Sequence, residues 1–433
     1  MQGSPKIFIS AGEASGEHYG TLLIDALRRI EPDAEFFGLG GRRMEDLGFR
    51  PIVRAEDVAV MGITEVVRHM PRIYREYRRL RASIAAERPD AAVLIDFPDV
   101  NLSLARHLKR QGVPVIYFVS PQLWAWKKYR IRSVQRYVDR MLTIFPFEER
   151  FYHDHGVEAE FVGHPLAELE PPHVSREDFA REAGLDPSKT WIGLLPGSRE
   201  KEVRLNLPEM VRAAAMLCPT KPNPAVAETA IPGRDIEFVM PLAPTLTGPQ
   251  RDHIRVLLSE LLRPTKPNPG VAGTPTVAAE ANPPRIVVVE DARAVLHHAT
   301  ASIVASGTAT VEAALIGNPF IVVYRISPLS YAVAKRVVDV PHVAMVNLIA
   351  GKRIVPELIQ GDFTADRVVS QLRPLVENED ARARMRANLR QVGEMLRSEQ
   401  SAVGRVAQIT SELMRRRMMR QRLTPEERQS QVR

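Results

Sequence analysis

Residues 7–17 read Ile-Phe-Ile-Ser-Ala-Gly-Glu-Ala-Ser-Gly-Glu, a short apolar run that leads at once into a glycine-containing turn. The apolar run has the length of a buried strand, and the residues beyond the turn suit the start of a helix. A secretion signal would need a charged start and then a longer apolar block. This stretch therefore predicts the first strand–turn–helix unit of an α/β fold.

The same alternation of short apolar runs and amphipathic segments continues along the chain. It is typical of a parallel sheet with helices on both faces. A proline-rich linker at residues 165–175 separates two such series. The predicted strands are 7–11, 36–39, 91–96, 113–119, 141–145 and 160–162 before the linker, and 191–195, 237–242, 286–289, 301–305 and 320–324 after it.

The predicted architecture is therefore two Rossmann-like domains, residues 1–168 and 169–365, that face a central cleft. Residues 366–433 are expected to form C-terminal helices and a basic tail that pack back on the first domain. Two segments rich in Pro, Ala, Thr and Gly, near 219–234 and 263–285, share the string Thr-Lys-Pro-Asn-Pro. Their composition cannot bury a core, so they are predicted to be surface insertions without a catalytic role.

Composition excludes several classes of function. The formal charge of +7 favours an anionic partner, which is a nucleic acid, an anionic lipid or a phosphorylated substrate. The basic residues are not interleaved along one groove-like motif, so nucleic acid is not expected. No apolar run reaches about 18 residues, which argues against a membrane-spanning helix and for the cytoplasm. The single cysteine, Cys218, excludes an internal disulfide and a cysteine-based zinc site, and no metal site is predicted.

Open α/β sheets bind ligands beyond the carboxyl ends of their strands, so the turns after the predicted strands are the candidate ligand sites. The turn after the first predicted strand contains Gly12, Glu13, Ser15 and Gly16. Free N–H groups at the helix that it opens would suit a phosphate or a sugar hydroxyl. The same residues also suit a plain turn with Ser15 as the helix cap.

Two acids, Asp96 and Asp99, follow the predicted strand 91–96. A carboxylate there could take a proton from an attacking hydroxyl, and a partly dry cleft would raise its pKa toward that task. Alternatively, both acids cap the turn and the next helix. Trp124 and Trp126 follow the next predicted strand, where an aromatic face suits a sugar ring or an acyl chain, although both could simply pack.

The second domain offers two turns that suit an anion. Gly197, Ser198 and Arg199 follow its first predicted strand, where glycine permits close backbone approach and a guanidinium fork can grip a diphosphate. Small residues at a helix start suit a phosphate, and an acid one turn later suits ribose hydroxyls. Each of these could be a capped turn, but together they favour a nucleotide. The residues in this second group are Ser306, Gly307, Thr308 and Glu312, with Tyr324, Arg325 and Asn347 as further candidates.

Residues 66–81 form a basic amphipathic segment that contains six arginines. A helix of this kind can lie in a membrane interface and attract anionic lipid. It can equally be a helix that packs on the sheet with a solvated charged face. The residues predicted to associate with a membrane are Val66, Met70, Ile73 and Tyr77, with Arg72 and Arg75.

Taken together and in order, these motifs resemble the lipid-A-disaccharide synthases. Any one string is weak, but their order and spacing are specific and cover most of the chain. The motifs that carry the resemblance are Ala11–Gly16, Val60–Val66, Asp96–Asn101, Val119–Trp126, Phe161–Pro165, Leu195–Arg199, Ser306–Thr310 with Glu312, and Asn347–Leu348.

The resemblance implies a glycosyltransferase-B fold that needs no metal or other cofactor. It implies UDP-2,3-diacylglucosamine as donor and 2,3-diacylglucosamine 1-phosphate (lipid X) as acceptor, giving the β(1→6)-linked disaccharide 1-phosphate and UDP. The first domain would face the acceptor and the membrane, and the second would bind the UDP-sugar. The protein would be cytoplasmic and peripheral to the inner membrane, and a homodimer is left open.

On this interpretation Asp99 is the base that deprotonates the acceptor hydroxyl, with Asp96 as the second candidate. The nearest alternatives are another UDP-N-acetylglucosamine-using enzyme of the same fold, namely a 2-epimerase or a cell-wall glycosyltransferase. A non-catalytic protein that binds nucleotide or lipid is an alternative of a different class.

Overall fold

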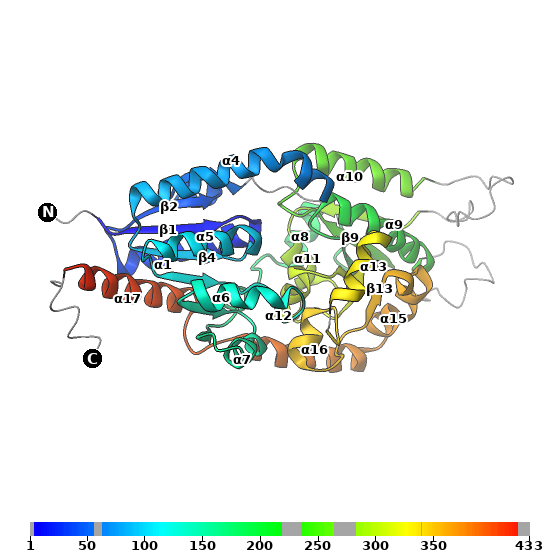
Figure 1. Ribbon diagram of the computed structural model, residues 1–433. Helices are drawn as coiled ribbons and strands as arrows, with labels where there is room; N and C mark the ends of the chain where they lie inside the picture. Colours follow the sequence, from blue (N-terminus) through cyan, green and yellow to red (C-terminus); the bar gives the residue numbers. More distant parts are fainter. Residues whose placement is uncertain (1–3, 56–62, 219–234, 264–282, 339, 423–433) are drawn as a thin grey trace. The chain divides into compact units, whose positions relative to one another are not determined.

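The structure is a computed structural model that describes residues 4–55, 63–218, 235–263, 283–338 and 340–422 (Figure 1). The first predicted insertion, 219–234, and most of the second lie outside the described residues. The chain divides into two compact units, Met1–Glu168 with Leu396–Arg433, and Leu169–Met395.

The first unit contains a parallel sheet of seven strands in the order β3-β2-β1-β4-β5-β6-β7. Its strands are β1 Lys6–Ala11, β2 Glu35–Gly40, β3 Arg50–Arg54, β4 Ala91–Ile95, β5 Val115–Phe118, β6 Arg140–Thr143 and β7 Ala159–Phe161. Its helices are α1 Ala14–Ile30, α2 Arg42–Glu45, α4 Ile63–Glu87, α5 Pro98–Arg110, α6 Ile131–Tyr137, α7 Pro146–Asp154 and α17 Ala402–Arg422, with short 3-10 turns at Lys128–Arg130 and Pro165–Glu168.

Successive side chains of each strand point to opposite faces of this sheet. Because helices cover both faces, apolar side chains are buried on both. Phe8 and Phe37 lie in one core cluster with Leu80 of α4 and Leu104 of α5. On the other side α1 packs against α17, which also contacts β4. A segment from the far end of the sequence therefore completes the first unit.

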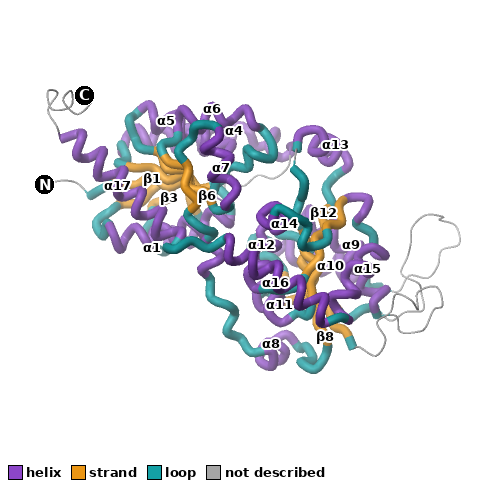
Figure 2. The backbone as a smooth tube through the Cα atoms, turned by 90° about the horizontal axis from the view of Figure 1, so that it is seen from below, coloured by secondary structure: helices purple, strands orange, loops and turns teal. Residues whose placement is uncertain are grey.

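The second unit contains a parallel sheet of six strands in the order β10-β9-β8-β11-β12-β13, which forms a layer between helices (Figure 2). Its strands are β8 Thr190–Leu195, β9 Ile236–Pro241, β10 Ile286–Val289, β11 Ala301–Ala305, β12 Phe320–Tyr324 and β13 Glu357–Ile359. Its helices are α8 Arg176–Ala183, α9 Glu200–Leu217, α10 Gly248–Leu261, α11 Ala292–His298, α12 Thr308–Ile316, α13 Pro328–Val337, α14 Met345–Ala350, α15 Ala365–Glu377 and α16 Glu379–Met395, with a 3-10 turn at Gln360–Asp362.

The C-terminal helices are shared between the units. From the sequence, residues 366–433 were predicted to pack back on the first domain. In the structure α15 and α16 belong to the second unit and α17 belongs to the first. Helix α15 packs on α9 and on β11 and β12, which explains why its apolar stripe is as strong as that of a core helix.

Each predicted strand is present, and the structure adds two edge strands that the sequence did not reveal. Strand β3 has the sequence Arg-Pro-Ile-Val-Arg, and β13 has only three residues, Glu-Leu-Ile. Edge strands pair on one side only and tolerate proline and charge, so they lack the continuous apolar run of a central strand.

Both sheets reverse their strand order at one point. In the first unit β1 pairs with β2 on one side and β4 on the other, and in the second unit β8 lies between β9 and β11. The crevice outside the strand ends at such a reversal is where open α/β sheets bind ligands. The turns after β1, β4, β8 and β11 are therefore the places where each unit can hold a ligand.

Candidate functional site

The turn after β1 is packed directly against the turn after β4. A side chain at Gly12 would bring its Cβ within 2.3 Å of the Phe97 ring, so only glycine fits there. Helix α1 begins at Ala14 with Glu13 as its N-cap residue. Ser15 therefore lies inside the helix, and the alternative in which it caps the helix does not hold. Gly16 lies beside Ala11 and Ile95, so the first turn of α1 contacts the ends of β1 and β4.

The turn after β4 has an unusual backbone, because Asp96 (φ 46°) and Phe97 (φ 47°) are both left-handed. Non-glycine residues pay a conformational cost there, so other contacts must hold the turn. The buried side chain of Asn101 donates to Asp96 O (2.7 Å) and Ile95 O (3.1 Å), and accepts from the Ser10 hydroxyl (2.6 Å). The sequence had given Asn101 no role, and the structure shows that it fixes where Asp96 points.

The two acids of this turn lie in opposite electrostatic surroundings. Burial raises the pKa of Asp96 to about 7, and the charge of Glu13 adds to that effect. The Asp99 side chain is 66% exposed and forms an ion pair with Arg130, while Lys127 Nζ lies 3.6 Å from the same oxygen. Partial burial raises the pKa of Asp99, but Arg130 and then Lys127 outweigh it, so the pKa lies below its usual value.

The turn after β5 contains the two tryptophans, and they differ in role. The Trp124 indole N–H donates to Glu148 Oε1 (3.0 Å), and its ring meets the edge of Phe147. Trp126 is 40% exposed, with Lys127 Nζ 4.1 Å from its ring centroid. One tryptophan therefore packs and the other is available to a ligand.

Glu148 anchors this turn from beneath. It is buried, and burial raises the pKa of its carboxyl to about 7, against the hydrogen bonds that it accepts. Besides Trp124 it accepts from the Phe145 amide (3.3 Å). Glu148 was not predicted, since an acid in the first turn of a helix is a common and uninformative signal.

In the second unit the turn after β8 is organised by an acid that the sequence analysis missed, Glu202. Its carboxylate accepts from the Ser198 amide (3.0 Å) and lies 3.4 Å from Arg199 Nη1. A Cβ at Gly197 (φ 133°) would come 2.6 Å from Glu202 Cβ, so this glycine is needed both for its conformation and for space. Glu202 thus occupies the donors that the sequence predicted to bind an anion. Its spacing, one helical turn after Arg199, was the available signal.

The turn after β11 is open. A Cβ at Gly307 would meet nothing within 4 Å, and α12 begins at Thr308 directly beyond it. The pKa of Glu312 is raised by burial, while nearby Arg293 lowers it and Asp291 raises it. This turn therefore combines a helix start with a partly buried acid, as expected for phosphate and hydroxyl groups.

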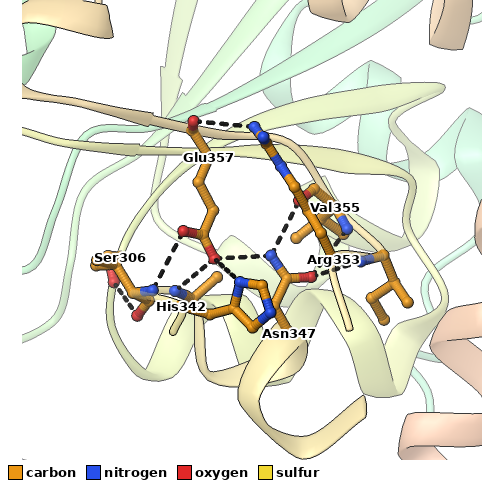
Figure 3. Close-up of polar contacts among 9 residues, drawn as sticks. Ser306, His342, Asn347, Arg353, Val355 and Glu357 are labelled. Carbon is orange, nitrogen blue, oxygen red and sulfur yellow. Dashed lines mark hydrogen bonds and ion pairs between the residues drawn. The ribbon is translucent and has the colours of Figure 1, made fainter. Parts of the chain in front are cut away.

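Asn347 has a different position from the one predicted. It is fully buried and makes four hydrogen bonds, in which Nδ2 donates to Val355 O (3.0 Å) and Glu357 Oε1 (2.7 Å) while Oδ1 accepts from the amides of Ile354 (2.7 Å) and Val355 (3.0 Å) (Figure 3). Its hydrogen-bonding capacity is used internally. Asn347 therefore joins α14 to β13 and does not offer donors to a ligand.

The partner of Asn347, Glu357, holds the segment that borders the turn after β11. Its carboxylate accepts from the amides of Val343 (3.1 Å) and Ala344 (3.0 Å) at the start of α14, and His342 Nδ1 lies 4.0 Å away. Val343 O in turn accepts from the Ser306 hydroxyl (3.4 Å) (Figure 3). Neither Glu357 nor His342 was predicted, because the edge strand that carries Glu357 was not recognised.

The two candidates that end β12 separate in the structure. Burial raises the pKa of Tyr324, and the charge of Glu202 adds to this while Arg199 opposes it, which places Tyr324 beside the turn after β8. Arg325 donates to Phe363 O, lies 3.4 Å from Glu209 Oε2 and stacks over the Phe363 ring. These contacts of Arg325 are with α9 and with the segment that follows β13.

Helix α4 carries the residues predicted to associate with a membrane. The side chains of Val66 and Met70 lie outside the described part of the structure. The Tyr77 ring packs on the core of the first unit and its hydroxyl lies 2.6 Å from Ser103 Oγ, so Tyr77 faces the protein. Tyr74, which was not predicted, is 61% exposed. Arg72 and Arg75 are exposed and Ile73 is half-buried.

Two features are absent from the residues that the structure describes. No helix among them is both long and apolar enough to cross a membrane. No group of three or more His, Cys, Asp or Glu side chains in the same residues is arranged to hold a metal ion.

Comparison with known proteins gives consistent matches along the chain. The family model described as lipid-A-disaccharide synthetase matches residues 7–228 and 276–410. A lipid-A-disaccharide synthase of Acidobacterium capsulatum is 61% identical over 96% of this chain and 98% of its own length. Another, from Koribacter versatilis, is 47% identical over 93% of this chain and 97% of its own.

Solved structures share the fold at low identity. A putative UDP-N-acetylglucosamine 2-epimerase of Listeria monocytogenes matches with a TM-score of 0.57 and 15% identity, covering 95% of this chain and 97% of that one. The epimerase of Neisseria meningitidis, bound to UDP-GlcNAc, matches with a TM-score of 0.53 and 11% identity over 95% and 100%. These likenesses show the α/β fold of glycosyltransferase-B enzymes and epimerases, whereas the sequence matches decide between the families. The chain belongs to the lipid-A-disaccharide synthase family and is a glycosyltransferase.

Proposed function

We propose that this protein condenses UDP-2,3-diacylglucosamine with 2,3-diacylglucosamine 1-phosphate (lipid X), giving the β(1→6)-linked disaccharide 1-phosphate and UDP. The observation that carries the proposal is the placement of two acids, Asp96 and Asp99, at the strand reversal of the first sheet. Such a crevice binds ligands, and a carboxylate is the group that proton removal from a sugar hydroxyl requires. A module that only bound nucleotide would need neither acid.

In the proposed reaction Asp99 takes the proton of the acceptor 6-hydroxyl as that oxygen attacks the anomeric carbon of the donor. The new bond forms on the face opposite UDP, and the electrons of the breaking carbon–oxygen bond leave with the diphosphate. Inversion of an α-linked donor then gives the β-linkage. Asp99 is the more accessible acid, whereas the pKa of about 7 favours Asp96, which remains the second candidate.

The departing diphosphate gains negative charge, and the second unit supplies groups that suit it. Arg199 offers a guanidinium fork, and the turn of Ser306, Gly307 and Thr308 offers the start of α12. Glu202 would yield the Ser198 amide and Arg199 to the ligand, since it now accepts from both. Preorganised donors of this kind stabilise developing charge at low reorganisation cost, so no metal or other cofactor is proposed.

Glu312 and Tyr324 lie next to these turns and are proposed to contact the rest of the nucleotide. Glu312 would accept hydrogen bonds from ribose hydroxyls. On the other side of the reaction, the turn of Gly12, Glu13 and Gly16 packs on the turn of Asp96 and is proposed to contact acceptor or donor phosphate. Asn347 and Arg325 are proposed to act indirectly, by fixing the segments that carry the contacts.

The acylated substrates reside in a membrane, and α4 is the proposed site of peripheral association with the inner membrane on its cytoplasmic side. Its exposed residues include Arg72, Arg75 and Arg78 with the aromatic Tyr74. Positive charge attracts anionic lipid, and an exposed aromatic ring suits the headgroup region.

The direct test is a turnover assay in detergent micelles with EDTA present. Purified protein is given both acylated substrates, and UDP and the disaccharide 1-phosphate are measured by mass spectrometry. Formation of both products in the presence of EDTA is expected. Saturable UDP binding without disaccharide would contradict the proposed acceptor, and turnover that depends on added Mg²⁺ would contradict the metal-free mechanism.

A further inference from the structure

Two cationic side chains lie close to the carboxylate of the proposed base, Asp99. Lys127 and Arg130 both approach the same oxygen of Asp99, Oδ1. Both cationic side chains are mostly buried, at 26% and 19% exposure, whereas Asp99 is 66% exposed. Two positive charges therefore share one carboxylate, and the cluster carries an excess of one positive charge.

The sequence around the two cations adds positive charge and no negative charge. Residues 120–138 contain no acid, and they carry five cations between 127 and 136. Asp96 lies on the same turn as Asp99, but burial raises its pKa to about 7, so it is not a full negative charge near neutrality. An excess of positive charge in a partly buried place attracts an anion.

The loop that carries Lys127 and Arg130 is held in place by contacts with the rest of the first unit. The turn that precedes them is tied down by the Trp124 bond to Glu148 and by the Tyr152 hydroxyl, which donates to Pro121 O (2.9 Å). Lys127 itself adopts a left-handed backbone (φ 53°), and its ammonium lies over the Trp126 ring. These contacts hold the loop that carries Lys127 and Arg130 in a defined conformation.

The contact with Asp99 is of the kind that a ligand can replace. An ion pair with one highly exposed partner contributes little to stability, because water competes for the exposed carboxylate. A phosphomonoester carries more charge and more acceptor oxygens than a carboxylate, and a guanidinium fork matches it well. The exchange of a carboxylate for a phosphate on these two cations is therefore favourable.

We propose that Lys127 and Arg130 bind the phosphate of the acceptor and that this exchange frees the Asp99 carboxylate to take the proton of the acceptor hydroxyl. The inference rests on the proposed function, because it takes the acceptor to be a sugar 1-phosphate. The anomeric phosphate and the 6-hydroxyl lie on different sides of a sugar ring. The long side chains of Lys127 and Arg130 can follow the phosphate while Asp99 stays with the hydroxyl.

The exchange has a chemical consequence for the base. In the free protein Arg130 and Lys127 hold the pKa of Asp99 below its usual value, against the effect of partial burial. Once the cations turn to the phosphate, burial acts without that opposition and the nearby phosphate charge adds to it. The pKa of Asp99 then rises toward the operating pH, which improves a general base. Acceptor binding thereby activates the base that deprotonates the acceptor hydroxyl.

The test compares two acceptors, 2,3-diacylglucosamine 1-phosphate and 2,3-diacylglucosamine, with wild type and the variants Arg130→Met, Arg130→Lys and Lys127→Met. Arg132→Met, an exposed cation two residues further on, is the matched control. In wild type we expect kcat/KM to favour the phosphorylated acceptor. Arg130→Met should reduce kcat/KM for that acceptor about 10- to 100-fold, as loss of a charged hydrogen bond predicts, and spare the other acceptor. Lys127→Met should act in the same direction, Arg130→Lys should recover part of the loss, and Arg132→Met should match wild type.

A pH profile separates this role from a merely structural one. With the unphosphorylated acceptor, the acid limb of kcat/KM reports the base of the free enzyme. It should move to higher pH in Arg130→Met, because the cation that lowers the pKa of Asp99 is gone. An equal loss with both acceptors, no preference in wild type, or an unmoved acid limb would overturn the inference. Disaccharide formation by wild type in the same assay would leave the proposed function standing in each of those cases.

Discussion

Asp96 and Asp99 follow the same strand, β4, and are three residues apart. Burial nevertheless raises the pKa of Asp96 to about 7, whereas Arg130 holds the pKa of Asp99 below its usual value. The difference arises because the left-handed turn at Asp96 points one acid inward and the start of α5 carries the other outward. The two acids can therefore be told apart by experiment even though they lie on one turn.

The first prediction concerns turnover. Asp99→Asn should lower kcat by about 10²- to 10⁴-fold, the contribution of a general base, while UDP affinity stays near that of wild type. Steady-state kinetics and UDP titration measure the two quantities. An acid limb of kcat/KM near pH 7 that disappears in Asp96→Asn would instead identify Asp96 as the base. Equal loss of turnover and of UDP affinity in Asp99→Asn would indicate a structural role.

The second prediction concerns stability and pH. The pKa of Asp96 is raised by folding, so between about pH 4 and pH 7 the folded protein binds more protons than the unfolded chain. The contribution of Asp96 to the free energy of unfolding therefore falls as pH rises through this range. Relative to wild type, Asp96→Asn should gain stability up to pH 7, by at most on the order of 4 kcal/mol, and then level off.

Urea unfolding at pH 5, 6, 7 and 8 measures this difference. Asp99→Asn is the matched control, because a carboxyl whose pKa is lowered contributes stability that is lost only in more acidic solution. Its difference from wild type should be constant over the same pH range. A flat difference for Asp96→Asn would show that Asp96 is not desolvated.

The third prediction separates two arginines of the second unit. Arg325→Met removes the bond to Phe363 O and the contact with Glu209, so it should lower the free energy of unfolding by about 1–3 kcal/mol. Arg199→Met changes an exposed side chain and should leave stability within about 0.5 kcal/mol while weakening UDP binding. Urea unfolding and UDP calorimetry on both variants measure stability and UDP affinity. The reverse pattern would make Arg325 the ligand contact and Arg199 the structural residue.

The fourth prediction concerns the network around Asn347. Asn347→Ala leaves the amides of Ile354 and Val355 buried without an acceptor, and should cost about 2–4 kcal/mol of stability. Ser306→Ala removes only one long hydrogen bond to Val343 and should cost about 0.5 kcal/mol or less while weakening UDP binding. Unfolding and UDP titration are the measurements. Full stability in Asn347→Ala, combined with lost UDP affinity, would return Asn347 to the list of direct contacts.

The fifth prediction concerns α4. Tyr74→Ser and Arg75→Gln should each weaken binding to vesicles that contain anionic phospholipid, by roughly 1 kcal/mol for the arginine. Tyr77→Phe should bind as wild type does, because Tyr77 faces the core and loses only its contact with Ser103. Sedimentation with vesicles of mixed phosphatidylglycerol and phosphatidylethanolamine measures binding. Equal binding by all four proteins would place the membrane contact elsewhere.

The order of elements and most strands of both sheets could be read from the sequence, because a buried parallel strand must be a continuous apolar run and each run here ends in a turn. The same logic located the turns at Gly12, Asp96, Gly197 and Ser306, which follow central strands and which we propose contact the ligands. The edge strands β3 and β13 carry no such signal. Because β13 was not predicted, the role of Glu357 was not predicted either.

What each polar side chain does was decided by the tertiary structure. Asn347 and Arg325 looked like ligand contacts in the sequence, but partners 7 to 116 residues away use their hydrogen bonds. Glu202 and Arg130 were overlooked because an acid or a cation on a helix is common, and only the fold brings them to the Ser198 amide and to Asp99. Apolar periodicity is a local property that a sequence records directly. Hydrogen-bond partners and desolvation depend on residues that are distant in the chain, so they exist only once it has folded.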